Sequence, residues 1–332
     1  MRIRRDRYLK IGAFFILLTI ILIAGCLSVD TSEKGPYSNP SLIEGSIHSG
    51  GLERSYLINV PSSYEGDSSM PLVIALHGSG GTGRDMVMLT LGGLNRLSEE
   101  EGFIIVYPDA IGRHWNSGRD DVAYNPSIKD VDDVAFISDL IDHIASEYNT
   151  SEGRVYVTGM SNGGFMSHRL ACEIPEKITA IAPVVGGMRE EYVTDNTSLK
   201  PLPVLIINYV DDPIVPWEGR EIRLGRRSLG NVSSVNQTVN YWVLRNNCSE
   251  EKVEIVWTAK STSEGSVLYK VVHYSNCSDC SDVVLYAIEE GGHTWPGGYQ
   301  RRTESTTGEG ELGLDANEVI WNFFRNKSSG DV

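Results

Sequence analysis

Apolar runs alternate with amphipathic stretches along most of the chain, and this alternation is its clearest structural signal. Short unbroken apolar runs are typical of strands that are buried on both faces. Strands are expected at 54–60, 72–76, 103–107, 155–158, 178–182, 204–207, 267–272 and 283–288. Helices are expected at 83–101, 134–144, directly after 161, 235–244 and 316–324. Strands that alternate with helices predict the α/β class, as one domain with a mostly parallel central sheet flanked by helices.

The N-terminal residues 1–25 follow a different pattern and are not expected to belong to the fold. Five basic side chains precede an apolar run from Ile11 to Ala24, which is short for a membrane span of roughly 20 residues. A basic start, an apolar stretch and small residues at its end are typical of an export signal. Ala24-Gly25-Cys26 resembles a lipobox, which would make Cys26 a lipid-modified first residue. An uncleaved single-span anchor is the alternative. Either way the rest of the chain is expected outside the cytoplasm, lipid-anchored to the cell membrane or secreted.

Composition changes again after residue 25. Residues 26–44 are rich in Ser, Gly, Pro and charge, which is typical of a flexible tether. Residues 45–327 have the length of one large catalytic domain, and 328–332 form a tail. The formal net charge is −15, and it would be −19 without residues 1–25, which carry five basic side chains and one acidic side chain. Such a surface repels phosphate backbones, so nucleic acid is not an expected partner.

The stretch around Ser161 carries the strongest chemical signal. The expected strand at 155–158 runs into Gly159-Met160-Ser161-Asn162-Gly163, and a helical segment follows. Gly-x-Ser-x-Gly between a strand and a helix is typical of a nucleophile elbow, in which the glycines let neighbouring backbone pass closely. A chain with 34 glycines can contain the pattern by chance, so the flanking strand and helix decide its interpretation. They predict that Ser161 is a nucleophile at the positive end of a helix.

A glycine-rich loop, His77-Gly78-Ser79-Gly80-Gly81, follows the expected strand at 72–76. Acyl transfer needs backbone N–H groups aimed at the carbonyl oxygen that becomes negative. Ser79 and Gly80 are the predicted donors from this loop, and Asn162, the residue after the nucleophile, is predicted to supply another. His77 is interpreted as a structural residue that supports the loop.

The acid of a catalytic triad is expected after a later strand, in the chain order serine, acid, histidine. The run at 204–207 leads into Asn208-Tyr209-Val210-Asp211-Asp212-Pro213. Asp211 and Asp212 are both candidates, and Asp212 is favoured.

Two of the seven histidines, His273 and His293, follow this acid in the chain. His273 lies in or at the edge of an expected strand, where packing or solvation is its ordinary role. His293 lies in the glycine-rich segment 290–298, whose flexible backbone can present an imidazole to a distant serine. The predicted triad is therefore Ser161, Asp212 and His293.

Together these motifs resemble the polyhydroxybutyrate depolymerase-type esterases, an α/β-hydrolase group related to the feruloyl and acetylxylan esterases of carbohydrate esterase family 1. The resemblance extends over residues 45–300. It is carried by residues 77–81, 107–109, 132–136, 159–164, 212–217 and 292–297. It implies the same triad. Relatives commonly have His-Gly-Thr before the acid turn, where this chain has Asn208-Tyr209-Val210, and this departure concerns the shape of that turn.

The cysteines after Cys26 have two interpretations. Cys277-x-x-Cys280 has the spacing of metal ligands, but no second Cys or His pair accompanies it, and no metal site is expected. Outside the cytoplasm a disulfide is permitted. The resemblance implies a disulfide between Cys248 and Cys277, with Cys280 as the competing partner. Cys172 is expected to be a buried free thiol.

The sequence thus predicts a secreted, membrane-tethered serine esterase that needs no cofactor. Its expected partners are small or oligomeric esters: hydroxyalkanoate oligomers, feruloyl, acetyl or other short-chain esters. Trp115 and Trp295, in loops beside the predicted site, are candidates for substrate contacts, and packing within their loops is the alternative. Two other functions stay open, a serine peptidase on the same fold and a non-catalytic surface binding protein.

Overall fold

The structure is a computed structural model that describes residues 42–118, 128–194, 200–224, 227–258, 267–299 and 314–327. The chain divides into two compact units, Met1–Pro36 and Tyr37–Val332, and all described residues belong to the second. The expected signal peptide, Cys26, most of the tether and the tail therefore lie outside the described residues. Within the described ranges, no helix combines the length and the apolar character that a membrane crossing requires.

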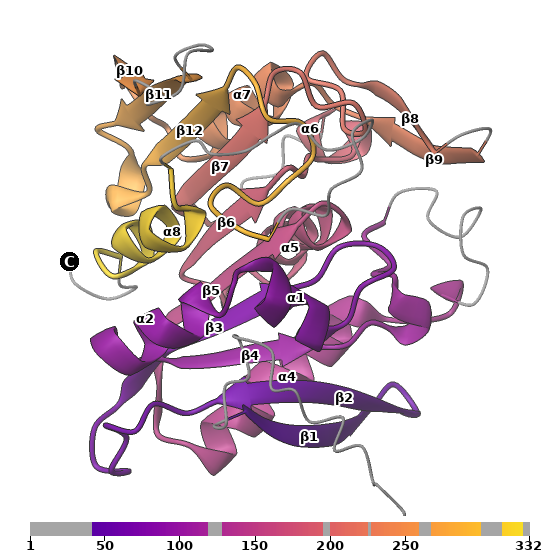
Figure 1. Cartoon of the computed structure of the whole chain (residues 1–332), viewed down its shortest axis with the longest axis vertical. Helices are drawn as coiled ribbons and strands as arrows, with labels where there is room; N and C mark the ends of the chain where they lie inside the picture. Colours follow the sequence, from indigo (N-terminus) through magenta and orange to yellow (C-terminus); the bar gives the residue numbers. More distant parts are fainter. Residues whose placement is uncertain are drawn as a thin grey trace, which may run out of the picture. The chain divides into compact units, whose positions relative to one another are not determined.

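A ten-stranded sheet forms the centre of the second unit (Figure 1). In spatial order its strands are β1 (Leu42–Ser49), β2 (Leu52–Asn59), β4 (Ile104–Pro108), β3 (Met70–Leu76), β5 (Thr150–Met160), β6 (Ala180–Val184), β7 (Val204–Tyr209), β12 (Val283–Ile288), β11 (Val267–Ser275) and β10 (Glu250–Thr258). The strands from β4 to β12 pair in parallel, and the strands at both edges pair antiparallel. The predicted mostly parallel sheet is confirmed.

Helices cover both faces of the sheet, which explains why its parallel strands are apolar along their whole length. On β3, Leu72 and Ile74 face one hydrophobic core, whereas Val73 and Ala75 face the other. The first core contains buried residues of α4 (Asp133–Glu147), α5 (Asn162–Glu173) and α7 (Val235–Arg245). The second contains buried residues of α1 (Gly83–Leu89), α2 (Gly93–Glu101) and α8 (Ala316–Phe324).

Several elements differ from the sequence-based expectation. Residues 42–44, expected in the tether, belong to β1, which pairs with β2 along its whole length. The helical stretch at 83–101 is two helices, because Leu91 and Gly92 adopt positive φ values of 54° and 67° between them. Elements not expected are β10, the hairpin of β8 (Arg220–Leu224) and β9 (Arg227–Val232), α6 (Glu190–Thr194), and the short 3₁₀ turns η1 (Ile111–Arg113) and η3 (Ser278–Cys280).

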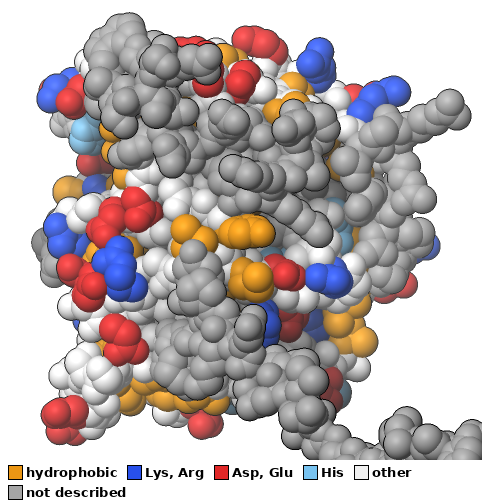
Figure 2. Space-filling view, viewed as in Figure 1, with side chains coloured by type: hydrophobic (Ala, Val, Ile, Leu, Met, Phe, Trp, Pro, Cys, Tyr) orange, Lys and Arg blue, Asp and Glu red, His pale blue; other side chains and the backbone are white. Residues whose placement is uncertain are grey.

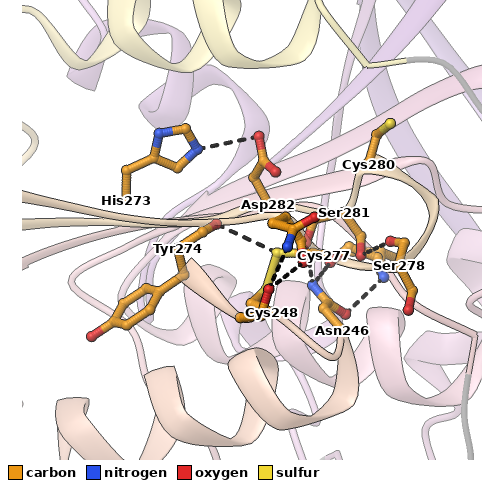
Figure 3. The surroundings of a disulfide bond; sticks show 12 residues. Asn246, Cys248, His273, Tyr274, Cys277, Ser278, Cys280, Ser281 and Asp282 are labelled. Carbon is orange, nitrogen blue, oxygen red and sulfur yellow. Dashed lines mark hydrogen bonds and ion pairs between the residues drawn. A yellow bond between two sulfur atoms is a disulfide. The ribbon is translucent and has the colours of Figure 1, made fainter. Parts of the chain in front are cut away.

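A disulfide joins Cys248, just after α7, to Cys277 in the connection between β11 and β12 (Figure 3). This is the pair that the resemblance implies, so that prediction is confirmed. Cys280 is an exposed free thiol, and Cys172 is a buried one, as expected. In the described part of the chain, no cluster of His, Cys, Asp or Glu side chains is arranged to hold a metal ion.

Acidic and basic side chains are interspersed on the face shown in Figure 2, with a few hydrophobic side chains near its centre. Ion pairs between exposed side chains also occur on the described surface, such as those of Arg96 with Glu100 and Glu318, at 2.6 Å each. A polyanion needs a surface on which positive charge gathers. The mixture of signs on this face gives no support for such a partner.

Candidate active site

Ser161 stands on a strained turn between β5 and α5. Its φ of 54° and ψ of −118° lie outside the regions that non-glycine residues commonly adopt. The two flanking glycines allow the close approach of backbone that this turn requires. A Cβ on Gly163 would lie 2.3 Å from the carbonyl oxygen of Leu76, and one on Gly159 would lie 2.6 Å from the backbone of Gly163. The local geometry is that of a nucleophile elbow.

Asp212 and His293 come together because their strands are neighbours. Asp212 follows β7 and His293 follows β12, and these two strands pair in parallel. Asp212 Oδ2 lies 2.8 Å from His293 Nδ1, with the aspartate side chain fully buried. The other carboxylate oxygen, Oδ1, accepts hydrogen bonds from the N–H groups of Ile214 and Val215, at 2.8 and 2.9 Å. These bonds fix the carboxylate in place and leave His293 Nε2 as the ring nitrogen able to act on a serine.

The structure separates the two candidate acids. Asp211 is exposed, and its Oδ1 accepts a hydrogen bond from the N–H of Gly292 at 3.3 Å. It therefore supports the backbone next to His293, whereas Asp212 contacts the imidazole itself. This arrangement favours Asp212 as the acid, and its catalytic role stays a prediction.

Ser161 and His293 line one cleft of about 240 Å³. The loop residues His77, Gly78, Ser79 and Gly81 form another part of its wall. The remaining lining side chains are Asp85, Met86, Leu89 and Met160, three of which are apolar. The cleft thus brings a nucleophile, a histidine and a glycine-rich loop around a small and largely apolar space.

Of the three predicted oxyanion donors, Ser79 lines this cleft and Asn162 directly follows Ser161, whereas Gly80 does not serve. The Gly80 N–H donates to the carbonyl of Arg113 at 2.7 Å, so it cannot also bind an oxyanion, and its assignment is corrected. The N–H groups of Ser79 and Asn162 have no hydrogen-bond partner among the described residues. Asn162 is the first residue of α5, so its N–H also lies at the positive end of a helix.

His77 supports the glycine-rich loop, as expected. Its Nδ1 lies 2.8 Å from the carbonyl oxygen of Gly78, and its Nε2 accepts the N–H of Ala110 at 3.1 Å. The first contact needs a proton on Nδ1 and the second needs a bare Nε2, so the two bonds select one neutral tautomer. Burial of the ring lowers the pKa of His77, which favours the same neutral form.

The assignment of Trp115 and Trp295 to the substrate is also corrected, because both side chains are fully buried. The indole N–H of Trp115 donates to the carbonyl of His77 at 2.9 Å, and that of Trp295 donates to Asn317 Oδ1 at 3.2 Å. Trp115 belongs to the first hydrophobic core and Trp295 to the second. A buried ring cannot stack on a substrate, so these residues brace the loops of the cleft.

The hairpin β8–β9 is a part of the site region that the motifs did not reveal. Its residues Ile222, Leu229 and Val232 form a small core with Phe165 of α5 and Val215 of the acid turn. The hairpin is thereby attached both to the helix behind Ser161 and to the segment behind Asp212. The apolar residues on each side of the turn were the available signal for two strands. The runs that they form are short, and arginines interrupt them.

Comparison with solved structures identifies the fold. The structure of an acetyl xylan esterase from Aspergillus awamori superposes with a TM-score of 0.54, covering 76% of this chain and 94% of that one at 17% identity. The chain has the α/β-hydrolase fold. The family model of X-Pro dipeptidyl-peptidases (S15 family) matches residues 68–200 of this chain. That segment includes Ser161 and ends before the acid turn and His293.

Three relatives that match most of this chain are named as esterases. A putative esterase, NocK, of Nocardia uniformis is 26% identical over 80% of this chain and 77% of its own length. Feruloyl esterase B of Piromyces equi is 26% identical over 79% of this chain, which spans only 44% of that protein. A probable feruloyl esterase C of Aspergillus niger is 24% identical over 83% of this chain and 88% of its own length. In sequence the chain is thus similar to feruloyl esterases.

Proposed function

We propose that this α/β-hydrolase is a serine esterase that cleaves carboxylic esters through an acyl-enzyme. The observation that carries the proposal is one cleft lined by Ser161, Ser79 and His293, with Asp212 bound to the His293 ring and the N–H groups of Ser79 and Asn162 without a partner among the described residues. Acyl transfer requires a nucleophile, a base oriented by an acid, and donors for the oxyanion. Each requirement has a residue in the described part of the chain.

The geometry supports the following sequence of steps. His293 Nε2 takes the proton from Ser161 Oγ as the oxygen attacks the ester carbonyl, and Asp212 holds the imidazole and stabilises its charged form. The carbonyl oxygen becomes negative and is stabilised by the N–H groups of Ser79 and Asn162. His293 then gives the proton to the departing alcohol. Water attacks the acyl-enzyme by the same route and releases the acid and free Ser161.

The cleft favours a small acyl group. Met86, Leu89 and Met160 supply an apolar wall within a volume of about 240 Å³, which suits an acetyl, short-chain or aryl acyl group. Esters of the feruloyl and acetyl-xylan type are the substrates that we favour, in keeping with the sequence relatives. Soluble hydroxybutyrate oligomers are the alternative within the same chemistry.

The family match to dipeptidyl-peptidases favours a second candidate, hydrolysis of an amide bond. Residues 68–200 include the elbow and the glycine-rich loop, which esterases and peptidases of this fold share. A panel of p-nitrophenyl, feruloyl, acetyl-xylan and hydroxybutyrate esters should be assayed beside an X-Pro p-nitroanilide, with Ser161→Ala as the control. We expect ester turnover that the substitution abolishes. Turnover of the anilide with inert esters would establish the peptidase instead.

We further propose that the enzyme acts outside the cytoplasm, attached to the membrane by a lipid on Cys26. The support is the Ala24-Gly25-Cys26 sequence after an apolar run. Cys26→Ser should leave the protein without its lipid, either released from membranes or unprocessed. Intact-mass measurement of the wild type provides the test, because a chain that retains Met1 would indicate an uncleaved anchor.

A further inference from the structure

The two oxyanion donors come from separate parts of the chain, and something must set the distance between them. Asn162 begins α5, whereas Ser79 belongs to the loop after β3. Donors stabilise a transition state only if they are already in place when the charge develops. A third segment, containing Trp115, contacts both parts.

The side chain of Asn162 is attached to Trp115 at both of its polar ends. Its Oδ1 accepts the backbone N–H of Trp115 at 2.7 Å, and its Nδ2 donates to the backbone carbonyl of Trp115 at 3.1 Å. Asn162 is only 1% exposed, so water does not compete for these bonds. The catalytic cycle described above uses the backbone of Asn162 and gives its carboxamide no role.

The same tryptophan reaches the other donor through its ring. The indole N–H donates to the carbonyl of His77 at 2.9 Å, two residues before Ser79. The Trp115 and His77 rings also pack at a centroid distance of 5.0 Å. The Phe136 ring stacks on the Trp115 ring at a centroid distance of 6.5 Å. One residue thus connects the start of α5 with the start of the glycine-rich loop.

The segment around Trp115 is itself held by a buried ion pair. The N–H of the next residue, Asn116, donates to Asp133 Oδ2 at 2.7 Å, and Asp133 Oδ1 accepts from Arg54 at 2.6 Å. Both charged side chains are buried, and the guanidinium of Arg54 lies 3.7 Å from the centre of the Phe136 ring. Trp115 is therefore a fixed point against which both donors can be placed.

We propose that the Asn162 carboxamide and the Trp115 indole form a brace that sets the spacing of the Ser79 and Asn162 N–H groups. Asn162 then acts as a positioning residue through its side chain, in addition to donating its N–H. This inference rests on the proposed acyl-transfer function and deepens it. It differs from a general role in stability, because a brace of this kind acts on the rate of the chemical step.

Asn246 offers a matched control. Its carboxamide also binds both polar groups of one residue, accepting the N–H of Leu202 at 3.0 Å and donating to the Leu202 carbonyl at 2.7 Å. It is fully buried and lies beside the disulfide, next to residues that do not line the cleft (Figure 3). Loss of this clamp should lower stability without touching the oxyanion donors.

The test compares Asn162→Ala with Asn246→Ala in ester hydrolysis and in thermal unfolding. Both should lower stability. We expect kcat of Asn162→Ala to fall about ten- to a hundredfold with little change in KM, because loss of a whole donor costs about 10²–10³. The kcat of Asn246→Ala should stay within about twofold of the wild type, since distant sites act independently.

A second readout addresses the oxyanion directly. A thionoester has sulfur, a weak hydrogen-bond acceptor, in place of the carbonyl oxygen that the two N–H groups bind. An intact pair of donors therefore gives a large ratio of ester to thionoester rates, and the ratio should shrink in Asn162→Ala but not in Asn246→Ala. Trp115→Phe, which keeps an aromatic ring but loses the indole N–H, should shrink it too and serves if Asn162→Ala does not fold.

The outcomes are distinct. If the wild type hydrolyses esters and Asn162→Ala and Trp115→Phe keep both kcat and the thionoester ratio, the brace is wrong and the proposed function stands. Equal loss of kcat in Asn162→Ala and Asn246→Ala would also overturn the brace, because it would mark a general effect of stability. A wild type that turns over no ester at all overturns both proposals.

Discussion

In the described part of the chain, two histidine–aspartate pairs lie at opposite ends of β12, and only one of them is built like a catalytic dyad. His293 Nδ1 lies 2.8 Å from Asp212 Oδ2, with side chains 9% and 0% exposed. His273 Nε2 lies 3.2 Å from Asp282 Oδ2, with side chains 42% and 25% exposed (Figure 3). The distances are similar, so the difference between the pairs is one of place and surroundings.

The strand β12 shows how place matters, because it lies between the two pairs. Asp282 comes just before its first residue, and His293 follows its last. In a parallel sheet the loops beyond the carboxyl ends of the strands meet on one side and form the usual ligand site. His293 is in such a loop beside the one that carries Asp212, whereas His273 belongs to the antiparallel strand β11.

The two pairs also differ in which nitrogen of the imidazole ring contacts the carboxylate. The bond from Asp212 to Nδ1 leaves Nε2 for the serine, as a triad requires. In the other pair the carboxylate faces Nε2 itself, and the two side chains are partly exposed, which weakens the ion pair. The first pair is therefore arranged for proton transfer and the second for a weak surface contact.

Replacing the histidines should separate the pairs most strongly. We expect His293→Ala to lower kcat by on the order of 10⁶, because triad residues act as a unit. His273→Ala should leave kcat within about twofold, since it does not contact the cleft. Steady-state kinetics on a p-nitrophenyl ester provides the comparison, and equal losses in the two variants would remove the distinction between the pairs.

Replacing the aspartates should again lower kcat more in the first pair than in the second, by a smaller factor than replacing the histidines. Asp212→Asn should lower kcat by roughly 10⁴, because the amide favours the wrong imidazole tautomer. Asp282→Asn and Asp211→Asn serve as controls, the second testing the neighbouring acid. A larger loss in Asp211→Asn than in Asp212→Asn would mean that the acid has been misassigned.

The disulfide beside the second pair should matter for stability and not for chemistry. Cys248 and Cys277 are 29 residues apart, and closing such a loop is worth roughly 3–4 kcal/mol in the chain-entropy model. Replacing both with Ser should lower the free energy of unfolding by about that amount and leave kcat unchanged. Urea unfolding measures the first and ester turnover the second. A loss of kcat with no loss of stability would contradict this division.

The exposed pair itself should give the smallest effect. An ion pair with this exposure contributes at most about 1 kcal/mol to the free energy of unfolding. A double-mutant cycle with His273→Ala and Asp282→Asn at low ionic strength measures this coupling. A coupling well above that value would show that the pair has a structural role which its exposure hides.

Much of the fold could be predicted because strands buried on both faces must be apolar throughout. The run at 72–76 and the sequence leading into Ser161 are of this kind, and β12 has the expected bounds. β1 and β10 were missed because edge strands carry polar and charged residues, as in Glu250-Glu251-Lys252-Val253-Glu254. Their assignment depends on pairing partners that a single sequence does not reveal.

The candidate site divides in a similar way. The contact between Asp212 and His293, and the cleft that His293 shares with Ser161, could be anticipated because chain order and glycine content leave few alternatives, and the catalytic roles of the three residues stay a prediction. The burial of Trp115 and the bond that occupies the Gly80 N–H were not, since both depend on how residues 109–117 fold over the glycine-rich loop. A loop sequence shows which groups it carries, but not which of them other loops will cover.

The adjacency of β7 and β12 has a consequence for how such a protein can change. Asp212 and His293 are 81 positions apart, yet the strands that carry them are hydrogen-bonded neighbours. The hairpin β8–β9, α7, β10 and β11 all lie in the excursion between those strands. That segment can be lengthened or replaced while β7 and β12, the strands at its two ends, remain paired. Changes within that segment can therefore leave the pairing of β7 with β12, and with it the contact between Asp212 and His293, in place.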